Sequence, residues 1–176
     1  MILPRNLLQR LSGNKLKVAF LLLLLLIVVQ IFTFKIPKIN LIYSSDEDKI
    51  YVFDVVDGKN SKRYLTFSPE FHLASKQGTI YTKQKDKIAS IYAKIMLCGF
   101  ALKPKPEKVL IVGMGIGVIP REIAEFFPSI KMDVVEISSK VRDVAIDYFD
   151  FQKTDNMNIF IQDGYDFILN STKNMI

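Results

Sequence analysis

The sequence predicts an α/β protein in which the first half of a parallel sheet follows a small β-hairpin module and an N-terminal transmembrane helix. Three observations support this prediction. A long apolar run stands near the start, two β-rich segments flank an Asp-Gly turn in the middle, and three short apolar strands alternate with helical segments from Val109 onward. The corresponding parts are residues 1–38, 39–102 and 103–176.

The apolar run from Val18 to Phe34 predicts a membrane anchor, because it holds no charge and spans roughly 25 Å as a helix. Basic residues precede it, as in a signal peptide, but no small residues follow at the spacing of a cleavage site. A retained single-pass membrane anchor, in contact with lipid through residues 18–34, is therefore favoured over a cleaved signal. Basic residues stand on both sides of the run, so the side of the membrane that holds the soluble part stays open.

The net charge of +6 lies in the N-terminal flank and the middle of the chain. Residues 1–108 hold 18 Lys and Arg against 8 Asp and Glu, whereas residues 109–176 hold 6 against 10. No folded surface with clustered Lys and Arg is predicted, so we expect no nucleic-acid partner. One cysteine and one histidine, Cys98 and His72, exclude a disulfide framework and a zinc site of His and Cys, and we expect no metal.

The middle of the chain predicts a hairpin followed by a helix. The runs Ile50–Val56 and Arg63–Phe67 are β-rich, and the Asp57-Gly58 pair between them is typical of a hairpin turn. Residues 86–100 carry an apolar face at helical spacing, which predicts an amphipathic helix with Ile88, Ile91, Tyr92 and Ile95 on that face. The Lys-Pro repeat at 103–106 ends this helix and forms a short connector.

The segment after the connector predicts a Rossmann-type nucleotide site. Val109–Val112 is wholly apolar, as expected of a strand that is covered on both faces. It leads into a glycine-rich turn and then into a helix that ends at Phe127. Glycines let the backbone approach a ligand, and a helix N-terminus offers free N–H groups. The expected ligand-binding residues of this turn are Gly113, Met114, Gly115 and Gly117.

Two further strand ends carry carboxylates toward the same edge of the sheet. The strand Met132–Ile137 ends in Glu136 and Ile137, where a carboxylate can accept hydrogen bonds from ribose hydroxyls. The strand Asn158–Gln162 is followed by Asp163 and Gly164. Ligands bind at the carboxyl ends of such strands, so these residues are expected in one crevice with the glycine turn.

Each of these features has a simpler structural explanation. The glycines alone could form a tight turn, and Glu136 could be a solvated strand end. Asp163 could be the N-cap of a helix that begins at Gly164. The convergence of three such features on successive strand ends favours the nucleotide site.

The stretches VLIVGMGIGVIPREI, MDVVEIS and IFIQDGYDFI resemble the spermidine synthase family of polyamine aminopropyltransferases. The resemblance covers roughly residues 41–168 and implies a Rossmann-type fold like that of S-adenosylmethionine methyltransferases. It implies S-adenosylmethionine or its decarboxylated form as cosubstrate, a polyamine as substrate, and Gln77 and Tyr92 as substrate-binding residues. Glu136 would hold the ribose and Asp163-Gly164 the adenine edge. The resemblance leaves open whether the chain forms a homodimer.

The sequence departs from the family at three places. Ile116 stands where the family's turn usually has an Asp that receives the aminopropyl ammonium, and Ala93-Lys94 replaces a His-Glu pair. The family's catalytic Asp lies on a fourth strand, which this sequence does not reach. The attacking amine must lose a proton, and no base stands in its matching position. We therefore assign no catalytic residue and expect an incomplete domain with an open edge on the strand Val109–Val112.

Three functions follow from these features. The first is a spermidine synthase-like transferase, which the match and the acidic balance after residue 109 support. The second is an S-adenosylmethionine-dependent methyltransferase, which Ile116 favours. The third is a non-catalytic membrane-anchored remnant. A dinucleotide dehydrogenase is disfavoured because Val118 stands at the third glycine of its fingerprint.

Overall fold

The computed structural model describes residues 13–33, 37–104 and 106–173. The chain divides into two compact units, with the boundary between residues 36 and 37. The first unit contains helix α1 (Gly13–Thr33). Its large apolar side chains between Leu16 and Ile27 are 47–67% exposed. The predicted span 18–34 coincides with α1 as far as Thr33, and Phe34 lies outside the described residues. Over the described ranges, no helix has the length and apolar character that a membrane crossing needs, so the predicted transmembrane helix is not supported.

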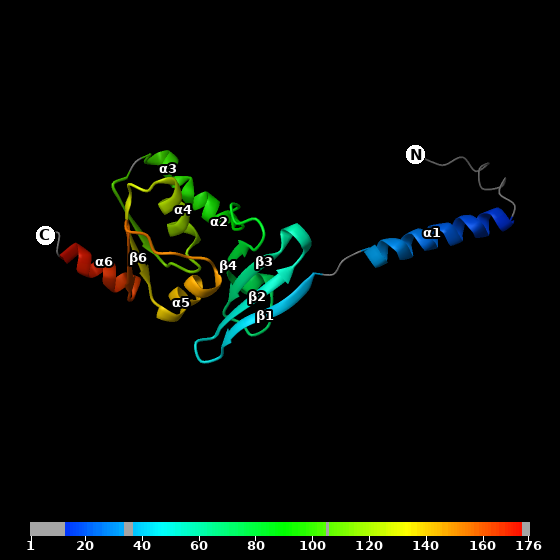
Figure 1. The fold of residues 1–176 in the computed structure, drawn as a ribbon, viewed down its shortest axis with the longest axis horizontal. Helices are drawn as coiled ribbons and strands as arrows, with labels where there is room; N and C mark the ends of the chain where they lie inside the picture. Colours follow the sequence, from blue (N-terminus) through cyan, green and yellow to red (C-terminus); the bar gives the residue numbers. More distant parts are fainter. Residues whose placement is uncertain (1–12, 34–36, 105, 174–176) are drawn as a thin grey trace. The chain divides into compact units, whose positions relative to one another are not determined.

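The second unit begins with a four-stranded antiparallel sheet in the order β1-β2-β3-β4 (Figure 1). The predicted hairpin is confirmed: β2 (Ile50–Val56) pairs with β3 (Lys62–Thr66) across the short helix η1 (Gly58–Asn60). The sequence did not predict the outer strands, β1 (Lys38–Ser45) and β4 (Lys76–Tyr81), which pair with β2 and β3. A second short helix, η2 (Leu73–Ser75), precedes β4.

The predicted helix over residues 86–100 is wrong in its bounds and in its buried face. Ser90 has an extended backbone, so α2 begins at Ile91 and ends at Leu97, and α3 covers Gly99–Leu102. Ile91 and Ile95 are 76% and 65% exposed. The helices instead turn Ala93, Leu97 and Phe100 toward the core.

A three-stranded parallel sheet follows, in the order β5-β6-β7. Its strands are β5 (Lys108–Val112), β6 (Lys131–Glu136) and β7 (Met157–Ile161). They alternate with α4 (Val118–Phe126), α5 (Ser139–Tyr148) and α6 (Gly164–Lys173), as the sequence predicts. Within the described part of the chain, β5 pairs only with β6, so the open edge expected of this strand is observed.

The helices pack on both faces of the parallel sheet. One face buries Ile111 and Val134 against Ile123 of α4 and Ala145 of α5. On the other face α6 lies against β6, and Phe167 packs on Phe160 of β7 with ring centroids 5.0 Å apart. Ser138 is the N-cap of α5, because the backbone N–H of Val141 donates to its Oγ.

The two sheets share one hydrophobic cluster, so the described residues from Pro37 onward pack as a single unit. Val52 and Leu65 of the small sheet join Val118 and Val144 of the parallel-sheet helices in this cluster. Arg63 adds a polar link, because it forms a bidentate ion pair with Asp54 and donates to the Tyr148 carbonyl at 2.7 Å. The hydrogen bonds to Asp54 raise the pKa of Arg63.

Candidate functional site

The glycine turn lies directly after β5, at the carboxyl edge of the parallel sheet. Gly113, Gly115 and Gly117 have φ angles of 89°, 54° and 75°, which other residues rarely adopt. A Cβ on Gly113 or Gly115 would meet no atom within 4 Å, so the space beside these two residues is open. Gly117 is closed in by Phe151, with which an added Cβ would collide. The first two glycines therefore present bare backbone to an open space, whereas the third is required for packing.

Glu136 joins the end of β6 to the glycine turn. Its side chain is 7% exposed, and Oε2 accepts hydrogen bonds from the backbone N–H groups of Met114 at 2.9 Å and Gly115 at 3.1 Å. The other oxygen, Oε1, accepts from the Ser138 N–H at 3.0 Å. A carboxylate has about four acceptor sites, so roughly one stays available for a ligand hydroxyl. The structure thus brings Glu136 to the turn, as predicted, but in a buried position rather than as a solvated strand end.

Asp163 and Gly164 have structural roles in addition to their predicted place at this edge. Asp163 Oδ1 accepts from the backbone N–H groups of Tyr165 and Asp166, so it caps helix α6. A Cβ on Gly164 would collide with Val112, which accounts for the glycine by packing alone. Ile137, the apolar residue that follows Glu136 in the chain, is 69% exposed.

A cavity of about 410 Å³ lies along β5 and reaches the glycine turn. Its lining includes Tyr92 and Met96 of α2 together with Gly113, Met114 and Gly115. The predicted substrate residue Tyr92 therefore shares a cavity with the predicted ligand turn. Burial raises the pKa of Tyr92, so its phenol is protonated at neutral pH and can donate a hydrogen bond. Gln77 is an exposed residue of β4 and does not line this cavity.

Ile116 occupies a place that the sequence did not predict. Its side chain is 3% exposed and belongs to the cluster that joins the two sheets. It lies against Gly78 of β4, where an added Cβ would be 2.7 Å from Cγ1 and Cγ2 of Ile116. The one sequence signal of this contact was Gly78 itself, because a glycine inside a strand often marks the close approach of another segment. Where the resembling family carries a ligand-binding Asp, this chain therefore has a packing residue.

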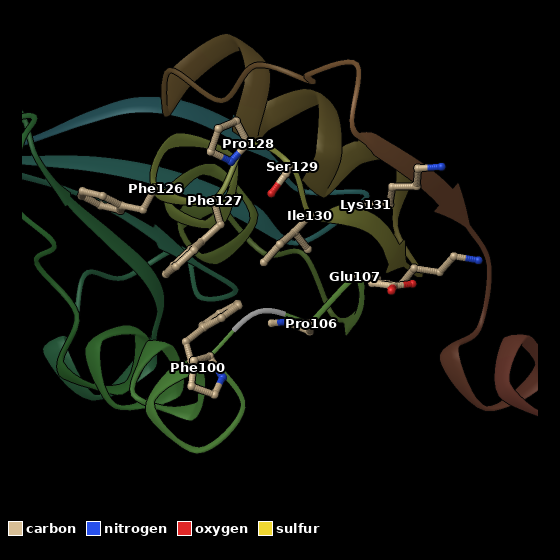
Figure 2. Close-up of a pocket in the computed structure, with 11 residues that line it drawn as sticks. Phe100, Pro106, Glu107, Phe126, Phe127, Pro128, Ser129, Ile130 and Lys131 are labelled. Carbon is tan, nitrogen blue, oxygen red and sulfur yellow. The ribbon is translucent and has the colours of Figure 1, made fainter.

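A larger cavity, of about 810 Å³, lies at the amino ends of β5 and β6 (Figure 2). Its lining includes Lys108 and Lys131, which begin β5 and β6, and the stacked rings of Phe100 and Phe127. Ligands of parallel α/β sheets bind at the carboxyl ends of the strands. The smaller cavity is therefore the candidate site despite its size.

The candidate cavity offers little acid–base chemistry. Tyr92 is the one titratable side chain among its lining residues. Over the described ranges, no three side chains of His, Cys, Asp or Glu gather as metal ligands would. The cavity offers an apolar wall, and Glu136 at the adjoining glycine turn offers a carboxylate to a nucleoside-like ligand. No carboxylate or imidazole stands among the residues that line the cavity.

Comparison with known proteins identifies a family. Residues 90–175 match the spermine/spermidine synthase domain. A polyamine aminopropyltransferase of Vibrio vulnificus is 30% identical over 161 residues, which are 84% of this chain and 53% of that protein. The chain thus spans about half the length of this relative. The family resemblance predicted from the sequence is confirmed.

Two other similarities extend the comparison. The mouse eEF1A lysine and N-terminal methyltransferase is 34% identical over 91 residues, which are 48% of this chain and 13% of that protein. A spermidine synthase crystallised with the transition-state analogue AdoDATO superposes with a TM-score of 0.54 at 21% identity, over 74% of this chain and 43% of that one. This likeness confirms the Rossmann-like, methyltransferase-type fold with its parallel sheet.

Proposed function

We propose that this chain, which carries a spermine/spermidine synthase domain over residues 90–175, binds an S-adenosyl ligand at the carboxyl edge of β5 and β6. The observation that carries the proposal is the meeting of Glu136 with the glycine turn. The buried carboxylate orders Met114 and Gly115, while the space beside Gly113 and Gly115 stays open. One ribose hydroxyl would donate to Oε1 of Glu136, and the sulfur-bearing chain would lie beside the turn.

The reaction class that the family supports is aminopropyl transfer to a polyamine. An amine nitrogen attacks the carbon beside the sulfonium, the carbon–sulfur bond breaks, and the sulfur leaves as a neutral thioether. The attacking ammonium must first lose a proton to a base. The acidic balance of residues 109–176 suits a polycationic acceptor. This chain's own residues account for ligand binding, whereas the base for the transfer is not among the residues that line the cavity.

Methyl transfer from S-adenosylmethionine is the second candidate, and Ile116 is the observation that favours it. A decarboxylated ligand presents an ammonium group at the end of its chain, which a carboxylate would be needed to hold. Ile116 supplies none and is turned into the core. Intact S-adenosylmethionine carries a carboxylate beside its ammonium, so its ammonium does not depend on an acidic side chain at position 116.

Calorimetric titration of the folded chain with each ligand tests the proposal. Saturable binding of either S-adenosylmethionine or its decarboxylated form is expected, with adenosine competing for the site. Tighter binding of the decarboxylated form supports aminopropyl transfer, and tighter binding of the intact form supports methyl transfer. A folded chain that binds neither ligand would overturn the proposal and leave a non-catalytic role.

A further inference from the structure

We propose that the contact between Gly78 and Ile116 is a positioning device, through which strand β4 of the small sheet sets the geometry of the glycine turn. Its effect on affinity rests on the proposed binding of an S-adenosyl ligand. The contact itself is a property of the structure and can be tested without a ligand. Neither residue touches the open space beside Gly113 and Gly115, so both would act through the turn.

The contact is tight because it joins a bare backbone to a stiff side chain. An added Cβ on Gly78 would lie 2.7 Å from Cγ1 and Cγ2 of Ile116 and 2.9 Å from its Cδ1. Two of these atoms are attached directly to Cβ of a β-branched residue, whose χ1 is strongly restricted. The side chain is also 3% exposed, so it has little room to move aside.

The glycine turn is held between two separate clusters of core residues. Met114, which is 5% exposed, packs in the cluster of the parallel sheet with Ile111 and Ile123. Ile116 packs two residues later in the cluster that contains Val52 and Leu65 of the small sheet. The two non-glycine side chains of the turn are thus anchored in different clusters, and Gly115 between them faces the open space.

The other restraints on the turn come from the parallel-sheet side. Glu136 fixes the N–H groups of Met114 and Gly115, and Phe151 closes in on Gly117. Ile116 is the side chain of the turn that packs in the cluster shared with the small sheet. A shift of β4 would therefore move Ile116, and with it the backbone of Gly115 and Gly117 on either side. The small sheet is by this inference a working part of the ligand site, rather than a separate module.

The test replaces Gly78 by Ala and uses Gly99→Ala as the matched control. Gly99 lies in α3, and an added Cβ there meets nothing within 4 Å. Gly78→Ala is expected to weaken binding of S-adenosylmethionine at least about fivefold, the lower end of typical coupling between sites. It should also speed hydrogen exchange of the hydrogen-bonded amides of Met114, Gly115 and Gly117. Gly99→Ala should change neither quantity.

If Gly78→Ala does not fold, two milder substitutions test the same contact. Ile116→Val removes one methyl group from the contact, and Ile130→Val removes one methyl group from the other cluster at a residue that does not line the candidate cavity. Faster exchange in the turn of Ile116→Val, relative to Ile130→Val, supports the positioning role. In the combined variant Gly78→Ala with Ile116→Ala, part of the lost protection should return.

The outcomes separate this inference from the proposed function. If the unaltered chain binds no S-adenosyl ligand, the proposed function fails and hydrogen exchange alone decides the contact. If the unaltered chain binds, and Gly78→Ala and Ile116→Val leave both affinity and turn exchange unchanged, the positioning role is wrong.

Discussion

Glu136 and Met114 are joined by a hydrogen bond of 2.9 Å, in which the backbone N–H of Met114 donates to Oε2 of the carboxylate. Both oxygens of Glu136 act as acceptors, because Oε1 takes the N–H of Ser138. A Gln at this position has one oxygen and one NH₂ group, so at least one of these backbone donors would lose its acceptor. The carboxylate therefore orders the turn.

We predict that Glu136→Gln weakens binding of an S-adenosyl ligand by about 1.5–3 kcal/mol, the range for hydrogen bonds to charged groups. Glu125→Gln is the control, because Glu125 is exposed on α4 and does not line the candidate cavity. Calorimetry on both variants, below their unfolding temperatures, measures the difference. Equal losses of affinity in the two variants would contradict the ribose assignment.

The sequence could place Glu136 and Asp163 at one edge of the sheet, because strand ends and a glycine turn follow directly from local patterns. It could not show what the side chains contact. The two donors from the turn, Met114 and Gly115, depend on the register between β5 and β6, in which Val112 lies beside Val135. Likewise the sequence left open whether Asp163 caps a helix, and the structure shows that it does.

Ile116 offers a second prediction, since it stands where the resembling family has an Asp. Ile116→Asp would place a carboxylate at a 3% exposed position inside an apolar cluster. We expect a loss of unfolding free energy on the order of 3–5 kcal/mol, as for an unpaired buried charge. Chemical denaturation measures it, and Ile146→Asp, at a 47% exposed position, should cost only about 1 kcal/mol or less.

The opposite outcome for this variant would be informative. If Ile116→Asp keeps its stability and binds decarboxylated S-adenosylmethionine more tightly than the unaltered chain, the side chain at 116 must reach the ligand. The packing of Ile116 on Gly78 would then not describe the working protein.

The elements of the parallel sheet were predictable, whereas the small sheet was predictable only in part. The strands from Val109 onward are short apolar runs closed by turn residues, and each alternates with a helix. β1 has turn residues on both sides, Pro37 and Asp46, but it stands close behind the apolar run. β4 contains Gly78, which weakens its β-rich pattern. The helix over residues 86–100 failed for another reason: Ile91 and Ile95 lie on a regular apolar stripe, but this stripe is exposed while Ala93 is buried. The spacing of apolar residues indicates which residues form one face of a helix, but not whether another element covers that face.

Membrane association through residues 18–34 stays a prediction from the uncharged run. We expect the chain to pellet with membranes and to resist extraction by alkaline carbonate. Replacing Leu22 and Leu25 by Lys should release it, since both substitutions put a charge into the uncharged run. The matched control replaces Ile39 and Leu41 of β1 by Lys. These two apolar residues are similarly exposed, at 51% and 52%. Release by both pairs, or recovery of a soluble form without the first thirty-odd residues, would contradict an anchor.

The last prediction is that the 176-residue chain binds its S-adenosyl ligand without turning it over. The attacking amine of a polyamine is an ammonium at neutral pH and must lose a proton before its nitrogen can attack. Tyr92 is the titratable side chain that lines the cavity, and burial raises its pKa above the ordinary value of 10.0. Its phenol is therefore protonated and cannot accept that proton.

Chromatography of the nucleoside products, after incubation with decarboxylated S-adenosylmethionine and a diamine, measures this turnover. We expect thioether release no faster than in buffer alone, while the aminopropyltransferase of Vibrio vulnificus serves as the positive control. Diamine-dependent release that disappears in Glu136→Gln would show that this chain holds a base which the cavity's lining does not reveal. Calorimetric titration of Tyr92→Phe, beside the same incubation, tests whether the phenol donates a hydrogen bond to the ligand. If Tyr92 only donates a hydrogen bond, the variant should lose ligand affinity by about 0.5–1.5 kcal/mol, the range for a neutral hydrogen bond, and still show no turnover.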